Sequence, residues 1–243
     1  MIRYDRGVRI MITSWEPVVD YLLKNMQKQV YKKDEKLPSE HELAQRFQLT
    51  RIEIRKAYDR LKELGYVYSK QGKGNYYAGY LEKVELSLSS CDSFSNKMST
   101  MSDRFYTRVI SCDKISYQRE IYAQLQAKED ETVLCIKRLR YIDQMPSAMH
   151  ISYVKQQRFP TIKEALGQNP SLYAFFHKEG MEGLKTEDVS LMVSNLNTEE
   201  RVYMNVSGIV PCLLVKSRTR NASNEILEVS TIIYRGDKFI FKM

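Results

Sequence analysis

The stretch LPSEHELAQRFQLTRIEIRKAYDRLKELG, residues 37–65, decides the fold of the first third of the chain. Its second half predicts one helix, because Thr50 followed by Glu53 forms a T-x-x-E capping box and Gly65 stands where a helix ends in a left-handed residue. Apolar residues recur between these ends at spacings of three and four, which indicates one buried stripe: Ile54, Ala57, Tyr58, Leu61 and Leu64.

Two arginines stand on the first turns of this helix. Arg51 and Arg55 are four residues apart and therefore share a face. At the N-terminal end of a helix, the dipole and the free N–H groups favour an anion. A solvated surface is the alternative for such a pair, and the neighbouring elements decide between the two.

A second, shorter helix precedes the first. Pro38 blocks helix on its N-terminal side, and Ser39 with Glu42 makes another capping box. The connection to the arginine helix is short, which is the pattern of a helix-turn-helix, whose second helix enters the major groove. A further helix is expected after Pro17, from the helical spacing of Val18, Leu22, Leu23 and Met26.

A glycine-rich turn follows the helices, in YVYSKQGKGNYY, residues 66–77. Aromatic residues on both sides of Gly72, Lys73 and Gly74 predict a β-hairpin. The G-K-G tripeptide lacks the spacing and context of a phosphate-binding loop. Next to a helix-turn-helix it is typical of a wing, from which Lys73 can reach the DNA backbone or minor groove.

Residues 37–77 resemble the winged-helix domain of the GntR family of bacterial transcriptional regulators. The resemblance rests on the order of L-P-S-E, [ST]-R-x-x-[VIL]-R and a G-x-G wing. It departs from the family at His41, where arginine is more common, and at Glu53, where threonine is usual. It implies that Arg51 and Arg55 bind DNA, and that the full set of DNA-binding residues is Ser39, His41, Thr50, Arg51, Arg55, Gly72, Lys73 and Gly74.

Charge along the 243-residue chain is uneven. Residues 1–80 hold 16 Lys and Arg against 10 Asp and Glu, whereas residues 81–243 hold 22 against 20. The basic excess favours nucleic acid as the partner of the first segment. No apolar run has the length of a membrane span and no secretory signal is present, so we expect a cytoplasmic protein. No C-x-x-C pair occurs among Cys91, Cys112, Cys135 and Cys212, so we expect reduced thiols and neither metal nor cofactor.

The rest of the chain favours strands. A serine-rich stretch, residues 86–102, reads as a linker or irregular segment. Seven candidate strands follow between residues 104 and 243, with three helical patterns at 116–126, 169–180 and 197–206. Because strands outnumber helices and follow one another directly, we expect an α+β domain with a mostly antiparallel sheet. The predicted division is a winged-helix domain at 12–79, a linker at 80–95 and a second domain at 96–243.

Arg138 and Arg140 are the residues of interest in the second domain. On a strand they point to one face, with Leu139 on the other. Two guanidinium groups on a mostly apolar strand need an anion, from the protein or from a ligand. The alternative is an edge strand with solvated arginines. Glu228, on a late alternating strand, either pairs with these arginines or faces a ligand's hydroxyl or amine.

From Val133 onward the chain resembles the UTRA effector-sensing domain of HutC-type GntR regulators, which shares its fold with chorismate lyase. The resemblance rests on the R-x-R strand, the NPSLYAFF helix start and the E-x-S-x-x-x-Y-R-G-D-x-F run. It departs at His150, where members that bind amino-sugar phosphates commonly have Glu. The effector residues that it implies are Ser93, Phe94, Ser95, Arg138, Arg140, His150, Ser171, Tyr173, Glu228 and Tyr234.

Three functions compete at this point. A ligand-responsive repressor explains the basic first third, the winged helix and the second domain together; it implies a homodimer on a palindromic DNA operator and a small anionic effector such as a sugar phosphate. A lyase-like enzyme acting on a small carboxylate lacks a nucleophile–base pair and a metal motif. A DNA-bridging protein without a ligand leaves the arginines as salt-bridge residues. We expect the repressor.

Overall fold

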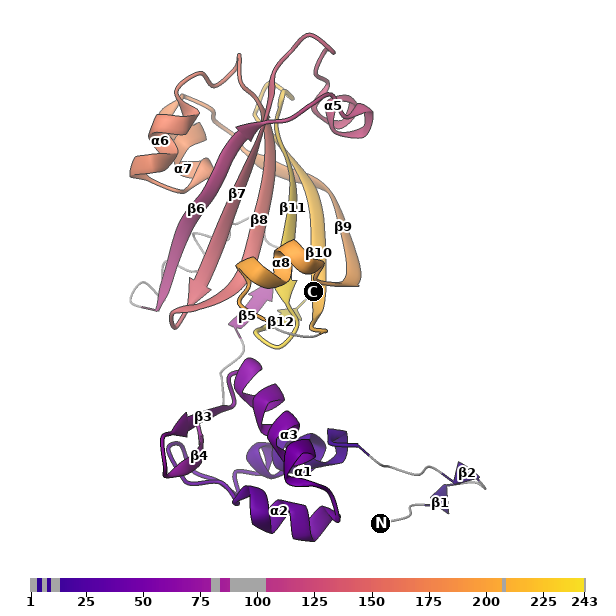
Figure 1. Ribbon diagram of the computed structural model, residues 1–243. Coiled ribbons are helices and arrows are strands. Elements are labelled where there is room, and N and C mark those ends of the chain that lie inside the picture. The colour runs from indigo at the N-terminus through magenta and orange to yellow at the C-terminus, as the bar shows by residue number, and fades with distance from the viewer. Residues whose placement is uncertain are drawn as a thin grey trace. The chain divides into compact units, whose positions relative to one another are not determined.

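The computed structural model describes residues 4–5, 8–9, 14–79, 84–87, 104–206 and 209–242. The chain divides into two compact units, Met1–Glu82 and Lys83–Met243, each with its own hydrophobic core. The ribbon shows helices dominating the first unit and one large sheet dominating the second (Figure 1).

The described part of the first unit contains helices α1 (Glu16–Gln27), α2 (Glu40–Phe47) and α3 (Arg51–Glu63) and the antiparallel strands β3 (Val67–Lys70) and β4 (Gly74–Tyr77). Two short paired strands, β1 (Tyr4–Asp5) and β2 (Val8–Arg9), come before them. The apolar faces of all three helices meet in one core, which includes Val18, Leu22, Leu43, Ile54, Tyr58 and Leu61.

Local hydrogen bonds set the ends of α2 and α3. Ser39 Oγ accepts from the N–H of Glu42 at 3.2 Å, and Thr50 Oγ1 accepts from that of Glu53 at 3.3 Å. Both carboxylates reach back to the cap N–H, so the two predicted capping boxes are confirmed. Gln48 ends α2 in the left-handed region at φ 55°, which lets α3 begin three residues later.

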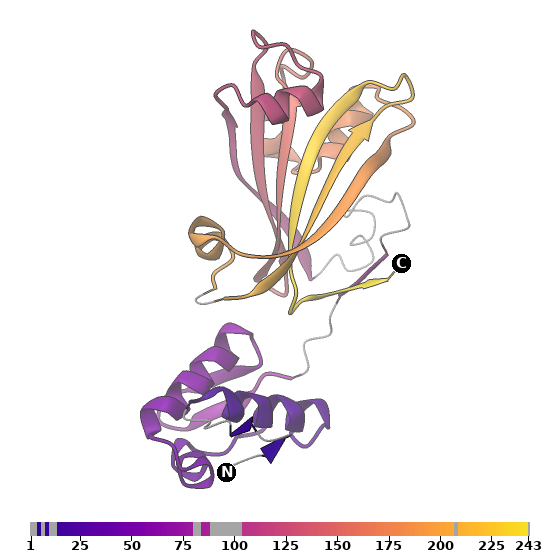
Figure 2. The ribbon, with the colours of Figure 1, turned by 90° about the vertical axis from the view of Figure 1, so that its right-hand side faces the viewer.

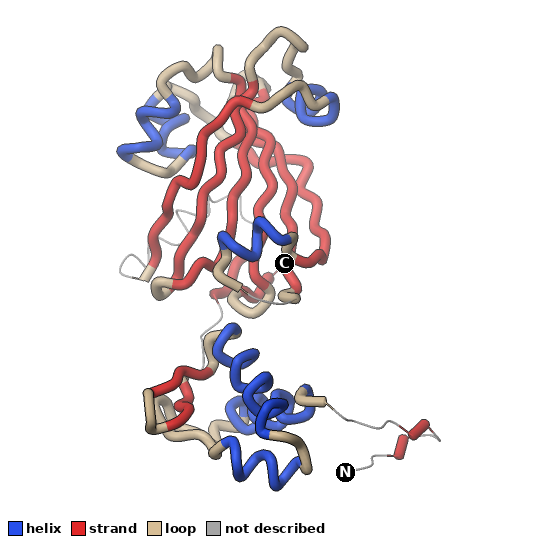
Figure 3. Tube along the Cα trace, in the orientation of Figure 1, coloured by secondary structure: helices blue, strands red, loops and turns tan. Residues whose placement is uncertain are grey.

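The second unit is built on an antiparallel sheet in the order β6-β7-β8-β11-β10-β9. Its strands are the long red segments of Figure 3. The strands are β6 (Phe105–Lys114), β7 (Val133–Ile142), β8 (Met145–Lys155), β9 (Lys185–Asn195), β10 (Pro211–Arg220) and β11 (Ile226–Arg235). β7 lies between β6 and β8, so its arginines do not belong to an edge strand and that alternative is excluded.

Apolar clusters cover the sheet on both faces. On the face of Ile136, helices α6 (Ile162–Gln168) and α7 (Leu172–Lys178) pack near one end, and the parallel pair β5 (Val84–Ser87) and β12 (Phe239–Lys242) packs on Ile142 near the other. The segment of α8 (Thr198–Tyr203) covers Leu139 on the opposite face, and α5 (Arg119–Leu125) packs on Val133. Figure 2 shows α8 and the β5–β12 pair on opposite sides of the sheet. Arg138 and Arg140 therefore lie between two apolar clusters on one face.

The mostly antiparallel α+β fold is confirmed, and every strand expected between residues 104 and 243 is present. Two elements of the second unit escaped prediction, as did the short strands β1 and β2. Helix α6 is only seven residues long, and strand β5 lies inside the interval 80–95 that was expected to be a linker. β5 is ordered by pairing with β12, where Val84 lies opposite Phe239. A partner so distant in the sequence leaves no local signal.

Candidate DNA-binding and effector sites

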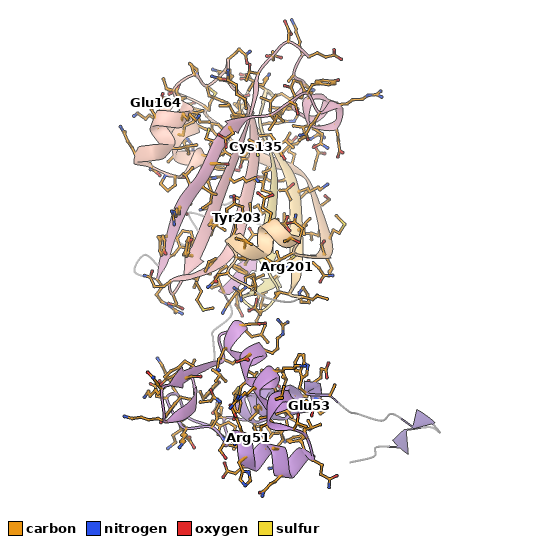
Figure 4. The ribbon with its side chains drawn as sticks, in the orientation of Figure 1. Arg51, Glu53, Cys135, Glu164, Arg201 and Tyr203 are labelled. Atoms are coloured by element: carbon orange, nitrogen blue, oxygen red, sulfur yellow. The ribbon has the colours of Figure 1, made fainter. Side chains whose placement is uncertain are left out.

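The two arginines of α3 lie on its exposed face and converge on one carboxylate. Their side chains are 64% and 62% exposed, and Arg55 Nε donates to Glu40 Oε2 at 3.0 Å. Arg51 Nη2 lies 3.7 Å from the same oxygen. Figure 4 shows Arg51 beside Glu53 at the start of α3. Such exposed ion pairs are weak, so both guanidinium groups can exchange Glu40 for another anion.

The cap residues of these helices use their side chains locally. Thr50 Oγ1 donates to Glu53 Oε2 at 2.8 Å besides accepting from its N–H. The N–H and hydroxyl of Thr50 lower the pKa of Glu53, and Ser39 lowers that of Glu42 in the same way. Glu53, where the family usually has threonine, is thus tied to the cap. His41 lies exposed on the first turn of α2.

The tip of the hairpin is a turn that glycine suits. Gly72 and Gly74 have φ values of 70° and 112°, where side chains are strained, and Lys73 is exposed between them. Lys70 Nζ lies 4.4 Å from the ring centroid of Tyr76, which stiffens the base of the tip. The geometry is that of a wing presenting a basic residue.

In the second unit, Arg138 and Arg140 are buried and meet at His150. Their side chains lie on one face of β7, and the structure leaves Arg138 2% and Arg140 3% exposed. Arg138 Nη2 lies 3.3 Å and Arg140 Nη2 3.1 Å from His150 Nδ1. Strand register explains the meeting, since Arg138 and His150 are cross-strand partners.

Further polar groups surround this triplet. Arg138 donates to Ser152 Oγ at 3.0 Å and to the Pro170 carbonyl at 3.1 Å. Arg140 donates to Thr107 Oγ1 at 3.1 Å. Arg138 Nη2 lies 3.8 Å from Glu228 Oε1, and Glu228 also accepts from Thr219 Oγ1 at 3.1 Å. Hereafter Arg138, Arg140, His150, Ser152, Thr219 and Glu228 are called the sheet cluster.

Burial controls the ionisation of the sheet cluster. Desolvation, followed by the charge of Arg138, lowers the pKa of Arg140 to about 9. Desolvation lowers the pKa of Arg138, opposed by the Glu228 carboxylate. Desolvation and the two guanidinium charges hold the pKa of His150 well below its usual range, so the ring is neutral. Burial of two cations in this cluster therefore costs free energy, and a bound anion would offset that cost.

The other predicted effector residues that the structure describes lie in several different elements. Ser171 is the N-cap of α7, and its hydroxyl accepts from the N–H of Ala174 at 3.2 Å. Tyr173 shares a 2.7 Å hydrogen bond with Thr186. Tyr234 is buried in the β5–β12 cluster. The structure thus joins Arg138, Arg140, His150 and Glu228 directly, while Ser93, Phe94 and Ser95 fall outside the described residues.

Sequence reasoning missed several members of these sites. Glu40 was not assigned to the arginines of α3, because 11 and 15 residues separate it from them. Thr219 and Thr107 lie on strands whose register could not be predicted. Ser152 carried a usable signal, since a residue two positions from His150 on a strand shares its face.

Comparison with known proteins identifies the families that the two units match. Residues 15–76 match the bacterial regulatory proteins of the gntR family, and residues 101–240, more than half of the chain, match the UTRA domain. The chain belongs to the GntR family. This GntR-family protein is therefore a ligand-responsive transcriptional regulator, and the lyase-like alternative is not supported.

Individual relatives of this GntR protein are distant but align over most of their length. It is 26% identical over 208 residues to the HTH-type transcriptional repressor NagR of Bacillus subtilis, covering 86% of this chain and 84% of NagR. It is 23% identical over 229 residues to the mannosyl-D-glycerate transport/metabolism system repressor MngR of Escherichia coli, covering 94% of each. The crystal structure of PhnF from Mycobacterium smegmatis shares the fold, at a TM-score of 0.61 and 18% identity over 93% of this chain and 97% of PhnF. None of the described helices has the length and apolarity to cross a membrane.

Proposed function

We propose that this protein is a cytoplasmic repressor that senses a small anionic sugar derivative, such as a sugar phosphate. The observation that carries the proposal is the meeting of two buried guanidinium groups at one neutral histidine. Charge-assisted hydrogen bonds from arginine suit phosphate and carboxylate oxygens. MngR, by its name, regulates the metabolism of mannosyl-D-glycerate, which combines a sugar with a carboxylate.

The effector class can be tested by thermal unfolding. We expect a phosphorylated or carboxylated sugar to raise the melting temperature in a screen of sugar phosphates, phosphonates and small carboxylates, because a ligand that binds only the folded state stabilises it. Arg158→Ala, which removes a surface arginine paired with Glu225 at 2.9 Å, should keep the shift. An equal shift with the neutral sugar of the same skeleton would contradict the proposal.

The effector would act on DNA affinity by binding one arrangement of the domains better than another. We propose that residues 80–95 join a winged-helix domain at 12–79 to an effector domain at 96–243, with β5 inside this connection paired to β12 of the second unit. A difference of about 1–3 kcal/mol in effector binding between arrangements gives roughly a 5–150-fold change in operator affinity.

We further propose a homodimer on a palindromic operator, since two recognition helices then read two half-sites. The surface that we propose for the second copy is β9, which ends the sheet. Its apolar side chains are exposed along most of the strand, and an edge strand can also pair through its backbone. They are Val189, Leu191, Met192 and Val193.

The proposed dimer surface can be tested by a substitution with a matched control. Val193 is 77% exposed on β9, and Val202 is 75% exposed on α8. Val193→Asp should shift the molar mass towards that of a monomer in light scattering at micromolar concentration, because it buries a charge in an apolar contact. Val202→Asp should leave the mass unchanged. A monomeric wild-type protein, or a Val193→Asp dimer of normal affinity, would rule this surface out.

A further inference from the structure

His150 holds a fixed tautomer because of what approaches Nδ1. Both arginines point an Nη2 group at this nitrogen, at 3.3 Å and 3.1 Å. Arginine only donates hydrogen bonds, so Nδ1 must offer its lone pair and cannot carry a proton. In a neutral imidazole the proton then sits on Nε2, which makes that side of the ring a hydrogen-bond donor.

The donor side of the ring is buried without a partner. His150 is 9% exposed, and neither its Nε2 nor the Nε of Arg138 has a hydrogen-bond partner within the described part of the chain. Buried polar groups in folded proteins are nearly always hydrogen-bonded, so two unpartnered donors in one cluster indicate where an acceptor binds. Both donors belong to the face that carries the arginines.

The groups around the ring keep it neutral when an acceptor arrives. Arg138 and Arg140 face it from β7, Ser152 shares its strand, and Glu228 on β11 reaches Arg138 at 3.8 Å. Since both charged groups that touch the ring are cations, protonation would add a third positive charge to a buried site, and burial already lowers the pKa of His150. The ring can therefore donate one hydrogen bond but cannot attract by charge.

We propose that His150 selects the chemistry of the effector: its Nε2–H and the Nε–H of Arg138 donate to an oxygen acceptor, so the effector presents a hydroxyl, carbonyl or anionic oxygen there and not an ammonium group. This inference rests on the proposed function of the sheet cluster as the effector site. A purely structural histidine would need only its Nδ1 contact, whereas selection of the effector requires the opposite side of the ring.

The tautomer can be measured without any ligand. The chain has three histidines, so ¹⁵N-histidine labelling gives few signals, and His41→Gln and His177→Gln assign the other two. We expect His150 in the full-length protein to show the neutral Nε2–H form from pH 7.5 to pH 5.5. A proton on Nδ1, or a charged ring at pH 7, would overturn the inference whatever the effector is.

Selection is tested with a pair of probes that differ in one group. Glucose 6-phosphate and glucosamine 6-phosphate differ by a hydroxyl and an ammonium at C2, and inorganic phosphate tests the anion site alone. We expect calorimetry to show wild-type protein binding the hydroxyl compound at least about tenfold more tightly, and His150→Glu to reverse the preference, because a carboxylate accepts from an ammonium.

Two further variants separate the donor from the ring. His150→Gln can place an amide N–H near the position of Nε2 and should keep the preference, whereas His150→Phe keeps a flat ring without a donor and should lose it. If the wild type and His150→Glu show the same preference, the inference is wrong although the anion site stands. If wild-type protein binds neither inorganic phosphate nor either sugar phosphate, the phosphate effector of the proposed function is wrong, and the tautomer measurement still decides the state of His150.

Discussion

Two pairs of arginines, one in each unit, both converge on a single acceptor atom, and their surroundings make them opposites. Arg51 and Arg55 approach Glu40 Oε2 with side chains 64% and 62% exposed. Arg138 and Arg140 approach His150 Nδ1 with almost no exposure. Water can replace the partner of the first pair, but it cannot replace the partner of the second.

The contrast separates two kinds of recognition. An exposed arginine pair loses little when it changes partners, so it suits a surface that must bind and release DNA. A buried pair is costly wherever its charge is not compensated, so a ligand that compensates it can shift a conformational equilibrium. The same residue type is thus proposed to read DNA in one unit and to sense a small molecule in the other.

The largest difference between the two units is expected in their stability, when the carboxylate that pairs with the arginines is removed from each. Glu228→Leu should lower the free energy of unfolding of the second unit by about 3–5 kcal/mol, because it leaves buried guanidinium charge without its carboxylate. Glu40→Leu should change that of the first unit by no more than about 1 kcal/mol.

Unfolding in urea can report the two units separately. The single tryptophan, Trp15, packs against the core of the first unit, so its fluorescence follows that unit. Circular dichroism also reports the unfolding of the sheet in the second unit. Equal losses in the two variants would show that burial does not distinguish the two pairs.

Loss of a buried arginine should abolish sensing and leave DNA binding intact. Arg138→Ala and Arg140→Ala should each weaken effector binding by about 1.5–3 kcal/mol, roughly 10–150-fold, because each removes charge-assisted hydrogen bonds. Operator affinity without effector should stay at the wild-type value in a gel-shift assay. An arginine whose variant still responds at the wild-type effector concentration is structural.

Loss of an exposed arginine should have the reverse effect: it should weaken DNA binding and leave sensing intact. Arg51→Ala or Arg55→Ala should weaken specific operator binding by about 1–3 kcal/mol if they contact guanine in pairs of hydrogen bonds. Lys73→Ala is the control on the wing: it should weaken binding to all sequences alike and flatten the dependence of affinity on salt. Normal operator affinity in both folded arginine variants would exclude α3 as the recognition helix.

Local sequence patterns predicted where the two arginine pairs lie, which is half of this comparison. The capping boxes at Ser39 and Thr50 depend on residues three apart, so the sequence alone placed α2 and α3 and put Arg51 and Arg55 on one face. The alternation of a strand likewise put Arg138 and Arg140 on one face. Each of these predictions needed no knowledge of a distant partner.

Such local patterns could not predict the acceptors that the arginines meet. The β7–β8 hairpin turns at Asp143 and Gln144, both with positive φ, and pairs Tyr141 with Pro146. Continued unchanged, that register would place Met149 opposite Arg138. A bulge between Arg140 and Tyr141 shifts it by one residue and brings His150 there instead. One unpaired residue therefore decides what the arginines meet, and the sequence carries no clear signal of it.

The smallest predicted effect follows from the neutral ring. Folding holds the pKa of His150 well below 6.5, whereas the unfolded chain takes up a proton as the pH falls through about 6.5. Below that pH the unfolded state binds more protons than the folded one, so stability falls with falling pH, by at most about 1.4 kcal/mol per unit. Between pH 7 and pH 5.5 this amounts to about 1 kcal/mol. Urea unfolding of the second unit should show that loss in the wild type and a smaller one in His150→Gln, where no imidazole titrates, and equal pH dependence would mean that His150 is protonated in the folded protein.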